Sequence, residues 1–298
     1  MHNRNIQKLD DIDSLTIVIV LFKEPYELIH KTLDLIKDFK IILIDNDYNK
    51  DLEKKIQKNF KIFKYVLNKK NNGFSAGYNQ GIRISNTIYT LILGPDCLIT
   101  KQDIFELIKK FSCYTDAAIV TPTSYNKENK LSYAGGPLPE NGQKDLILNM
   151  SGDVCVESAL GACMLIQTDK LKKNNLYFDE NLFLYFSDDD LCRRIKSFNK
   201  SIIQTIDSKC IHQHGNIKIK NKYLKIYARE FNFTHDQLYY FYKEKNKKYY
   251  EIINNFKKKI PSYYLKLTIK LLTFQLTEFV KIYSKLKGYY KFKSRYKS

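Results

Sequence analysis

Apolar runs alternate with segments of helical periodicity along the first two thirds of the chain. Residues 15–22 form a continuous, β-branched apolar run, which is typical of a strand buried on both faces of a parallel sheet. Similar runs follow, separated by short polar joints, so we expect a doubly wound α/β domain with a mostly parallel sheet flanked by helices. The expected strands are 15–22, 40–44, 62–67, 88–93 and 202–205, a further apolar run covers 159–166, and the expected helices are 25–37, a segment from 51, 76–84 and a short segment near 170.

Carboxylates follow two of these strands. Asp45 ends the strand at 40–44, and Asp96 comes after Gly94 and Pro95 at the end of the strand at 88–93. In doubly wound sheets, ligands bind beyond the carboxyl ends of the strands. A carboxylate there suits Mg²⁺ or Mn²⁺ on a diphosphate, because these ions prefer hard oxygen ligands. The alternative for Asp96 is a turn-forming role.

Glycines recur every fourth residue in 71–81, which reads NNGFSAGYNQG. The segment contains neither a dinucleotide fingerprint nor a Walker loop. The glycines could let a helix pack tightly against the sheet. Gly73 and Ser75 also create a polar helix start, where backbone N–H groups could meet a phosphate.

Three consecutive acids, Asp188, Asp189 and Asp190, interrupt an apolar and aromatic run. Adjacent carboxylates repel one another, so the cluster needs solvent, a cation or hydrogen-bond donors. One interpretation is a helix start with Ser187 as N-cap. The other is a general base at the floor of a cleft, which also explains why aromatic residues lead into the acids.

Cysteine and histidine usage suggests single ligands rather than a structural zinc site. The six cysteines are scattered without paired spacing, and we expect no disulfides. Cys210, His212 and His214 alternate, but a fourth zinc ligand with proper spacing is missing. A single histidine that completes a carboxylate-based site is more economical, with His212 as the first candidate and His214 as the second.

The net charge of +18 is concentrated at the C-terminus. From residue 220 onward, 20 Lys or Arg stand against 5 Asp or Glu, whereas residues 1–219 carry 30 basic and 27 acidic side chains. Only six residues of the chain are Arg, the side chain favoured for reading base edges, so we do not expect a nucleic-acid partner. The lysine excess favours an anionic surface, and a solvated face is the alternative.

Regular alternation stops in residues 126–153, which we interpret as a long loop, and composition changes near residue 218. In the tail, residues 264–286 place lysines and threonines on one stripe of an expected amphipathic helix. No apolar stretch is long enough to span a bilayer. The helix could lie on an anionic membrane, or pack on its own domain or a second subunit.

These patterns give an expected organisation of a polar lead (1–14), an α/β domain (15–217) and a basic helical extension (218–298). The start of the chain is polar, so we expect no signal peptide and a cytoplasmic location, peripheral on the inner face of the membrane.

The motifs together resemble the family 2 glycosyltransferases, especially the rhamnosyltransferase-like branch that builds bacterial surface polysaccharides. The resemblance runs through LTIVIVLFKEP, IILIDND, NNGFSAGYNQGI, LILGPDC, GACMLI, FDENLFLYFSDDDLCRRI and IHQHG, in the expected order from residue 15 to 215. It implies a GT-A fold, a nucleotide-sugar donor, a glycan acceptor that could be lipid-linked, and inversion at the anomeric carbon.

The resemblance also implies roles for individual residues. Asp45, with Asn46 beside it, matches the acid that holds the donor's base or ribose. Asp96 and His212 match metal ligands, and Asp188 matches the catalytic base. The remaining matches are Gly73, Gly77 and Asn79, in the segment that closes over the nucleotide, and Asp190, which orients the helix or the acceptor.

Two positions depart from the family's pattern. Gly94 offers no metal ligand where Asn or Asp is usual, and Ser187 replaces the Glu before the base. The first departure keeps open an alternative, a nucleotide-sugar-binding protein without catalysis, and the basic tail keeps open a nucleic-acid-binding protein. The primary expectation is an inverting glycosyltransferase that uses a divalent metal.

Overall fold

The computed structural model describes residues 12–143, 147–213, 219–245 and 247–296. The chain divides into two compact units. The first unit is Met1–Asp179 with Ser187–Lys218, and the second is Glu180–Phe186 with Ile219–Ser298. A short segment ahead of the acid triplet therefore belongs to the second unit.

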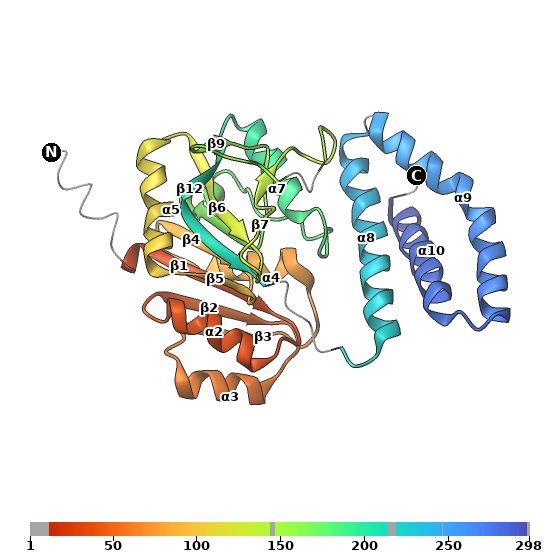
Figure 1. Ribbon diagram of the computed structural model, residues 1–298, viewed down its shortest axis with the longest axis horizontal. Helices are drawn as coiled ribbons and strands as arrows, with labels where there is room; N and C mark the ends of the chain where they lie inside the picture. Colours follow the sequence, from red (N-terminus) through yellow and green to blue (C-terminus); the bar gives the residue numbers. More distant parts are fainter. Residues whose placement is uncertain (1–11, 144–146, 214–218, 246, 297–298) are drawn as a thin grey trace. The chain divides into compact units, whose positions relative to one another are not determined.

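The first unit is built on one twisted sheet with the strand order β3-β2-β1-β4-β11-β6-β12-β5 (Figure 1). Strands β1 to β4 are parallel, and so are β6 and β12, whereas β11 is antiparallel between β4 and β6. The strands on this path are β1 (Leu15–Leu21), β2 (Lys40–Asp45), β3 (Lys64–Leu67), β4 (Tyr89–Leu93), β5 (Cys97–Ile99), β6 (Ala117–Tyr125), β11 (Cys163–Gln167) and β12 (Ser201–His212). The expected α/β class is confirmed.

Short strands occupy the segment expected to be a long loop and its continuation. Strand β7 pairs with β6, β9 pairs with β12, and β8 pairs with β10 as a separate two-stranded sheet. Their bounds are β7 (Leu131–Ser132), β8 (Gly135–Gly136), β9 (Val154–Cys155) and β10 (Ser158–Ala159).

Helices cover both faces of the large sheet because successive strand residues point to opposite sides. In β1, Ile17 and Ile19 pack in a core with α2, α3 and α5, whereas Val18 packs in the opposite core with α4, α6 and α7. The 3-10 turn η1 (Ile12–Ser14) leads into β1. The helices of this unit are α2 (Tyr26–Ile36), α3 (Lys50–Asn59), α4 (Gly73–Ile84), α5 (Lys101–Cys113), α6 (Thr168–Lys173) and α7 (Ser187–Ser197).

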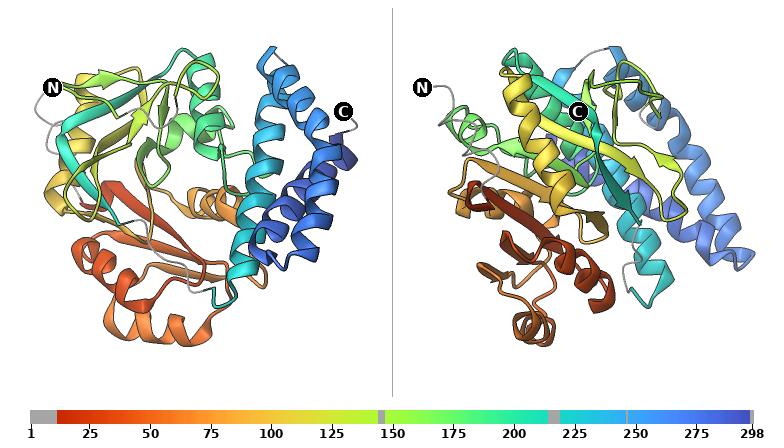
Figure 2. Two further views of the ribbon diagram at one scale, coloured as in Figure 1. Left: turned by 45° about the vertical axis from the view of Figure 1, so that its right-hand side comes forward. Right: turned by 60° about the vertical axis from the view of Figure 1, so that its left-hand side comes forward.

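The second unit consists of three long helices and the segment Glu180–Phe186. The helices are α8 (Lys222–Glu244), α9 (Lys247–Leu272) and α10 (Leu276–Tyr296). Helices α8 and α10 lie side by side (Figure 2), and their core is rich in aromatic residues. Over the residues that the structure describes, no helix is both long and apolar enough to cross a membrane.

The tail does not form the single helix expected over residues 264–286. Helix α9 ends at Leu272 and α10 starts at Leu276. Phe274 has a left-handed backbone, with φ of 52°, and the N–H of Gln275 donates to the carbonyl of Lys270 (2.9 Å). This is the hydrogen-bond pattern of a helix C-cap that usually contains glycine. Because phenylalanine occupies the position instead, the end of α9 has no glycine to mark it in the sequence.

Candidate active site

Three carboxylates gather at the carboxyl edge of the parallel strands. Asp45 ends β2, Glu24 follows β1, and Asp96 follows β4. Strands β2, β1 and β4 are neighbours and parallel, so their ends meet at one edge of the sheet. This is the edge where ligands of doubly wound sheets bind.

The pKa of Glu24 is raised. Burial raises its pKa from 4.5 to about 7, and the negative charges of Asp96 and Asp45 raise it as well, although its hydrogen bond from the N–H of Phe22 opposes the change. Acids with a raised pKa in a cleft are candidates for a functional role. The sequence reasoning did not single out Glu24.

Asp45 and Asn46 shape the turn after β2. The Asp45 carboxylate accepts hydrogen bonds from the N–H groups of Asp47 (2.7 Å) and Asn49 (3.2 Å) and from the Tyr65 hydroxyl (3.1 Å). The Asn46 amide donates to the carbonyl of Gly73 (3.0 Å). Asn46 therefore fixes the start of α4 beside Asp45.

The glycines of 71–81 have two roles. Gly73 opens α4 with φ of 82°, a conformation that glycine adopts without strain. A Cβ at Gly77 would lie 2.9 Å from Cγ1 of Val20, and one at Gly81 would lie 2.1 Å from Cγ1 of Val18. The packing interpretation therefore holds for Gly77 and Gly81. It brings the N-terminal turn of α4 close to the end of β1.

Asn79 lies in the buried part of α4. Its amide donates to the carbonyl of Phe178 and accepts from the N–H of the same residue, both at 2.9 Å. The Asn79 side chain thus satisfies both backbone hydrogen-bonding groups of Phe178, as a residue of a neighbouring strand would. It holds the chain that leads towards the acid triplet.

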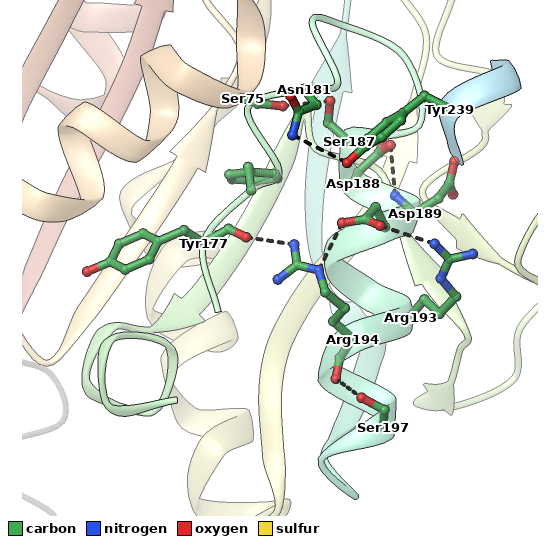
Figure 3. Close-up of polar contacts among 12 residues, drawn as sticks. Ser75, Tyr177, Asn181, Ser187, Asp188, Asp189, Arg193, Arg194, Ser197 and Tyr239 are labelled. Atoms are coloured by element: carbon green, nitrogen blue, oxygen red, sulfur yellow. Dashed lines mark hydrogen bonds and ion pairs between the residues drawn. The ribbon is translucent and has the colours of Figure 1, made fainter. Parts of the chain in front are cut away.

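The three acids of the triplet have different surroundings. Asp189 is fully buried and accepts from the Ser158 hydroxyl (2.6 Å). Asp190 is fully buried and pairs with Arg193 (3.1 Å) and Arg194 (2.9 Å), whose guanidinium also reaches the Tyr177 carbonyl (Figure 3). Asp188 alone of the three is partly exposed.

Asp188 stands in the first turn of α7 and is held by backbone groups. Its carboxylate accepts from the N–H of Gly161 (3.1 Å) and from the N–H of Asp189 (3.0 Å, Figure 3). Ser187, the first residue of α7, accepts a hydrogen bond from the Ser75 hydroxyl (2.8 Å). The N-terminal turns of α4 and α7 therefore meet at this point.

Residues 161 and 162 connect the triplet to the turn that carries Asp96. Gly161 donates to Asp188, and the carbonyl of Ala162 accepts from the N–H of Gly94 (2.7 Å). A Cβ at Gly161 would lie 2.6 Å from the Phe74 ring, so only glycine fits there without a shift. Two consecutive residues thus link the partly exposed acid to the turn that carries Asp96.

Asp96 and His212, the two residues predicted as metal ligands, lie close together. Their Oδ2 and Nε2 atoms are 3.4 Å apart, and the side chains are 17% and 15% exposed. Two ligands about 2.0–2.2 Å from one tetrahedral ion lie about 3.3–3.6 Å apart, so the pair fits a shared ion. His214, the second candidate, lies outside the described residues.

The segment before α7 is anchored within the helical unit. The Asp236 carboxylate, fully buried on α8, accepts from the N–H groups of Leu184 (2.9 Å) and Tyr185 (3.0 Å). Phe186 has a positive φ of 61° and stacks on Tyr240, with ring centroids 5.2 Å apart. Because Ser187 follows Phe186 in the chain, these contacts hold the backbone that leads into the acid triplet.

Comparisons with known proteins show the family of the chain. The sequence model of Glycosyl transferase family 2 matches residues 16–173. The chain is 27% identical over 214 residues to the low-salt glycan biosynthesis hexosyltransferase Agl10 of Haloferax volcanii, covering 67% of each protein. It is 26% identical over 192 residues to the dTDP-rhamnosyl transferase RfbF of Shigella flexneri, covering 60% of this chain and 62% of that protein.

Solved structures show the same fold at low sequence identity. A crystal structure of GalNAc-T7 with UDP, GalNAc and Mn²⁺ superposes with a TM-score of 0.56 at 12% identity, over 73% of this chain and 50% of that one. The TarS structure from S. aureus gives a TM-score of 0.51 at 12% identity, over 74% and 65%. The chain thus spans half the length of the first of these. It belongs to glycosyl transferase family 2 and is a glycosyltransferase with a GT-A fold.

Proposed function

We propose that the protein transfers a hexose or deoxyhexose from a nucleotide-sugar donor to a hydroxyl of a glycan, with inversion at the anomeric carbon. The observation that carries this proposal is the position of Asp188. It is the partly exposed acid of the triplet, and two backbone N–H groups orient its carboxylate. An acid held in this way suits a general base, which contributes about 10²- to 10⁴-fold to a rate.

In the proposed reaction, Asp188 takes the proton of the acceptor hydroxyl as the hydroxyl oxygen attacks the anomeric carbon. The bond to the nucleoside diphosphate breaks on the opposite face of the sugar. The hydrogen bond between Ser75 and Ser187 holds the N-terminal turns of α4 and α7 together beside Asp188. Asp190 contributes by keeping α7 rigid through its arginine pairs.

We place the donor at the carboxyl edge of the sheet. Asp45 and Asn46 lie beside the donor's base or ribose, and the N-terminal turn of α4, opened by Gly73, faces its diphosphate with backbone N–H groups. Asp96 and His212 would hold a divalent ion. Such an ion, when bound, neutralises charge on the departing diphosphate.

The names of the relatives support the substrate class. One is a glycan biosynthesis hexosyltransferase and the other a dTDP-rhamnosyl transferase. We therefore infer a glycan acceptor and a role in building surface polysaccharide. The structure of GalNAc-T7 contains UDP and Mn²⁺, which supports a nucleotide-sugar donor that binds together with a divalent metal.

The turn between α9 and α10 favours an acceptor carried by a membrane lipid. Apolar side chains on both sides of this turn are exposed, and lysines flank them. An anionic bilayer complements this combination of charge and apolar surface. The exposed side chains are Leu265 (64%), Ile269 (45%), Leu271 (54%), Leu272 (73%), Phe274 (85%) and Leu276 (42%).

Vesicle sedimentation tests this membrane contact. Burying two such side chains contributes about 3 kcal/mol or more, so the double variant Leu272→Ser, Phe274→Ser should bind anionic phospholipid vesicles on the order of 100-fold more weakly. Leu224→Ser is the matched control, because Leu224 is 59% exposed on α8. Equal binding by both variants would remove the membrane proposal and leave the transferase proposal intact.

The transferase proposal is tested with purified protein and a panel of UDP- and dTDP-sugars. We expect acceptor-dependent release of nucleoside diphosphate that stops when divalent ions are removed, and a product of inverted anomeric configuration by NMR. Nucleotide-sugar binding without release in the presence of glycan acceptors would instead favour a protein that binds the donor without catalysis.

A further inference from the structure

A thiol stands beside the two proposed metal ligands. One oxygen of Asp96, the sulfur of Cys97 and one ring nitrogen of His212 all lie within 4.8 Å of one another. Of all the His, Cys, Asp and Glu side chains that the structure describes, no other three gather in this way. Cys97 is completely buried, whereas the other two side chains are partly exposed.

The pairing of two strands sets this arrangement. Strands β5 and β12 are antiparallel, and their register places His212 opposite Cys97. Asp96 directly precedes β5, and its carbonyl accepts from the N–H of Gln213 (2.9 Å). The three ligand atoms are thus positioned by paired backbone on both sides rather than by a free loop.

Gly94 lies beside the carboxylate of Asp96. A Cβ at this position would lie 2.9 Å from Oδ1 of Asp96 and 3.5 Å from Sγ of Cys97. A side chain there would therefore crowd the carboxylate, whereas its distance from the sulfur is an ordinary van der Waals contact. Glycine at this position leaves room for the Asp96 carboxylate.

These three ligand atoms differ in chemical type from those that bind hard cations such as Mg²⁺. Mg²⁺ is bound by carboxylates, phosphates and water, whereas a set of one carboxylate, one imidazole and one thiolate suits Zn²⁺ or Co²⁺. Three protein ligands also leave a fourth tetrahedral position open. A thiolate ligand would lie about 3.6 Å from the other two ligand atoms, so separations that are now within 4.8 Å must shorten by about 1.2 Å at most.

We propose that Cys97 is the third protein ligand of the site and that the site takes Zn²⁺ or Co²⁺ in preference to Mg²⁺, with the open position directed to a diphosphate oxygen. The thiol proton passes to solvent as the metal–sulfur bond forms. The proposed function is needed for one part of this inference, which is that the fourth ligand is a diphosphate oxygen of the donor.

Cobalt binding to the metal-free protein tests the assignment. Co²⁺ should produce near-ultraviolet thiolate-to-metal charge-transfer absorption in the wild-type protein and in Cys163→Ser, but not in Cys97→Ser. Cys163 is the matched control, because it is another buried thiol, on strand β11. Zn²⁺ affinity should fall in Cys97→Ser by at least the roughly 10- to 100-fold that loss of an outer-shell partner costs.

X-ray absorption on the zinc-loaded wild-type protein covers the case in which Cys97→Ser does not fold. We expect one sulfur neighbour at about 2.3 Å. A shell of nitrogen and oxygen alone, or charge-transfer absorption that persists in Cys97→Ser, would overturn the proposal. If Mn²⁺-dependent sugar transfer remained in that case, the proposed function would stand and only the cysteine ligand would be rejected.

Discussion

Replacing Glu24 should stabilise the protein by an amount that depends on pH. The side chain lies between the charges of Asp45 and Asp96 at the carboxyl edge of the sheet, and burial raises its pKa to about 7. Glu24→Gln keeps the size of the side chain and an oxygen that can accept from the N–H of Phe22. The substitution therefore removes a charge without removing that hydrogen bond.

The size of this stability change follows from the difference between the ordinary Glu pKa of 4.5 and the pKa of about 7 that Glu24 has in the folded protein. Below pH 4.5 the carboxyl is protonated in both the folded and the unfolded chain, so its titration has no effect on stability. As pH rises towards 7, only the unfolded chain releases the proton, and the folded state is destabilised by up to about 3 kcal/mol. Glu24→Gln should therefore be more stable than wild type by about 3 kcal/mol at pH 8, and by less than about 1 kcal/mol at pH 5.

Urea unfolding at pH 5 and pH 8, with chelator to keep metal away, measures this difference. The control is Glu128→Gln, an exposed carboxylate whose loss should change stability by less than about 0.5 kcal/mol at both values. A gain for Glu24→Gln that is equal at the two pH values, or a loss at pH 8, would refute the reasoning about buried charge.

Three further predictions concern packing and ion pairs. Gly81→Ala should lower the free energy of unfolding of the first unit in urea by about 1–3 kcal/mol, because its Cβ would lie 2.1 Å from a Val18 methyl. The control is Gly152→Ala, whose Cβ would have no atom within 4 Å. It should change the free energy of unfolding by less than about 0.5 kcal/mol. Asp190→Asn should cost about 2–4 kcal/mol in the same assay by breaking two arginine pairs; an unchanged midpoint would show that the pairs are not structural. Gly288→Ala should lower the helical unit's unfolding temperature in calorimetry, because its Cβ would approach a backbone carbonyl to 2.5 Å; an unchanged temperature would exclude this tight contact.

The layout of the α/β unit could be predicted from the sequence because buried strands and strand ends leave local patterns. The apolar runs gave β1, β2 and β4, and the rule that ligands lie beyond strand ends pointed to Asp45 and Asp96. The same rule would have found Glu24, which follows β1, had it been applied to every strand.

Other features depend on contacts between distant residues and have no local pattern. The amide of Asn79 forms hydrogen bonds with the backbone of Phe178, which lies 99 positions away in the chain. No local pattern around Asn79 predicts this contact. Nothing in the sequence shows that Asp236 on α8 would anchor the segment before the acid triplet. The break at Phe274 was missed because a bulky residue takes the place that glycine usually marks.

The role of Asp188 as the base of a sugar transfer can be tested by comparing two variants with the wild-type protein. Asp188→Asn and wild type are compared for donor affinity by calorimetry and for sugar transfer in a single turnover, with Asp34→Asn, a 56% exposed surface acid, as the control. We expect Asp188→Asn to bind donor with an affinity within about twofold of wild type and to transfer sugar about 10²- to 10⁴-fold more slowly. Wild-type turnover in Asp188→Asn would contradict this role.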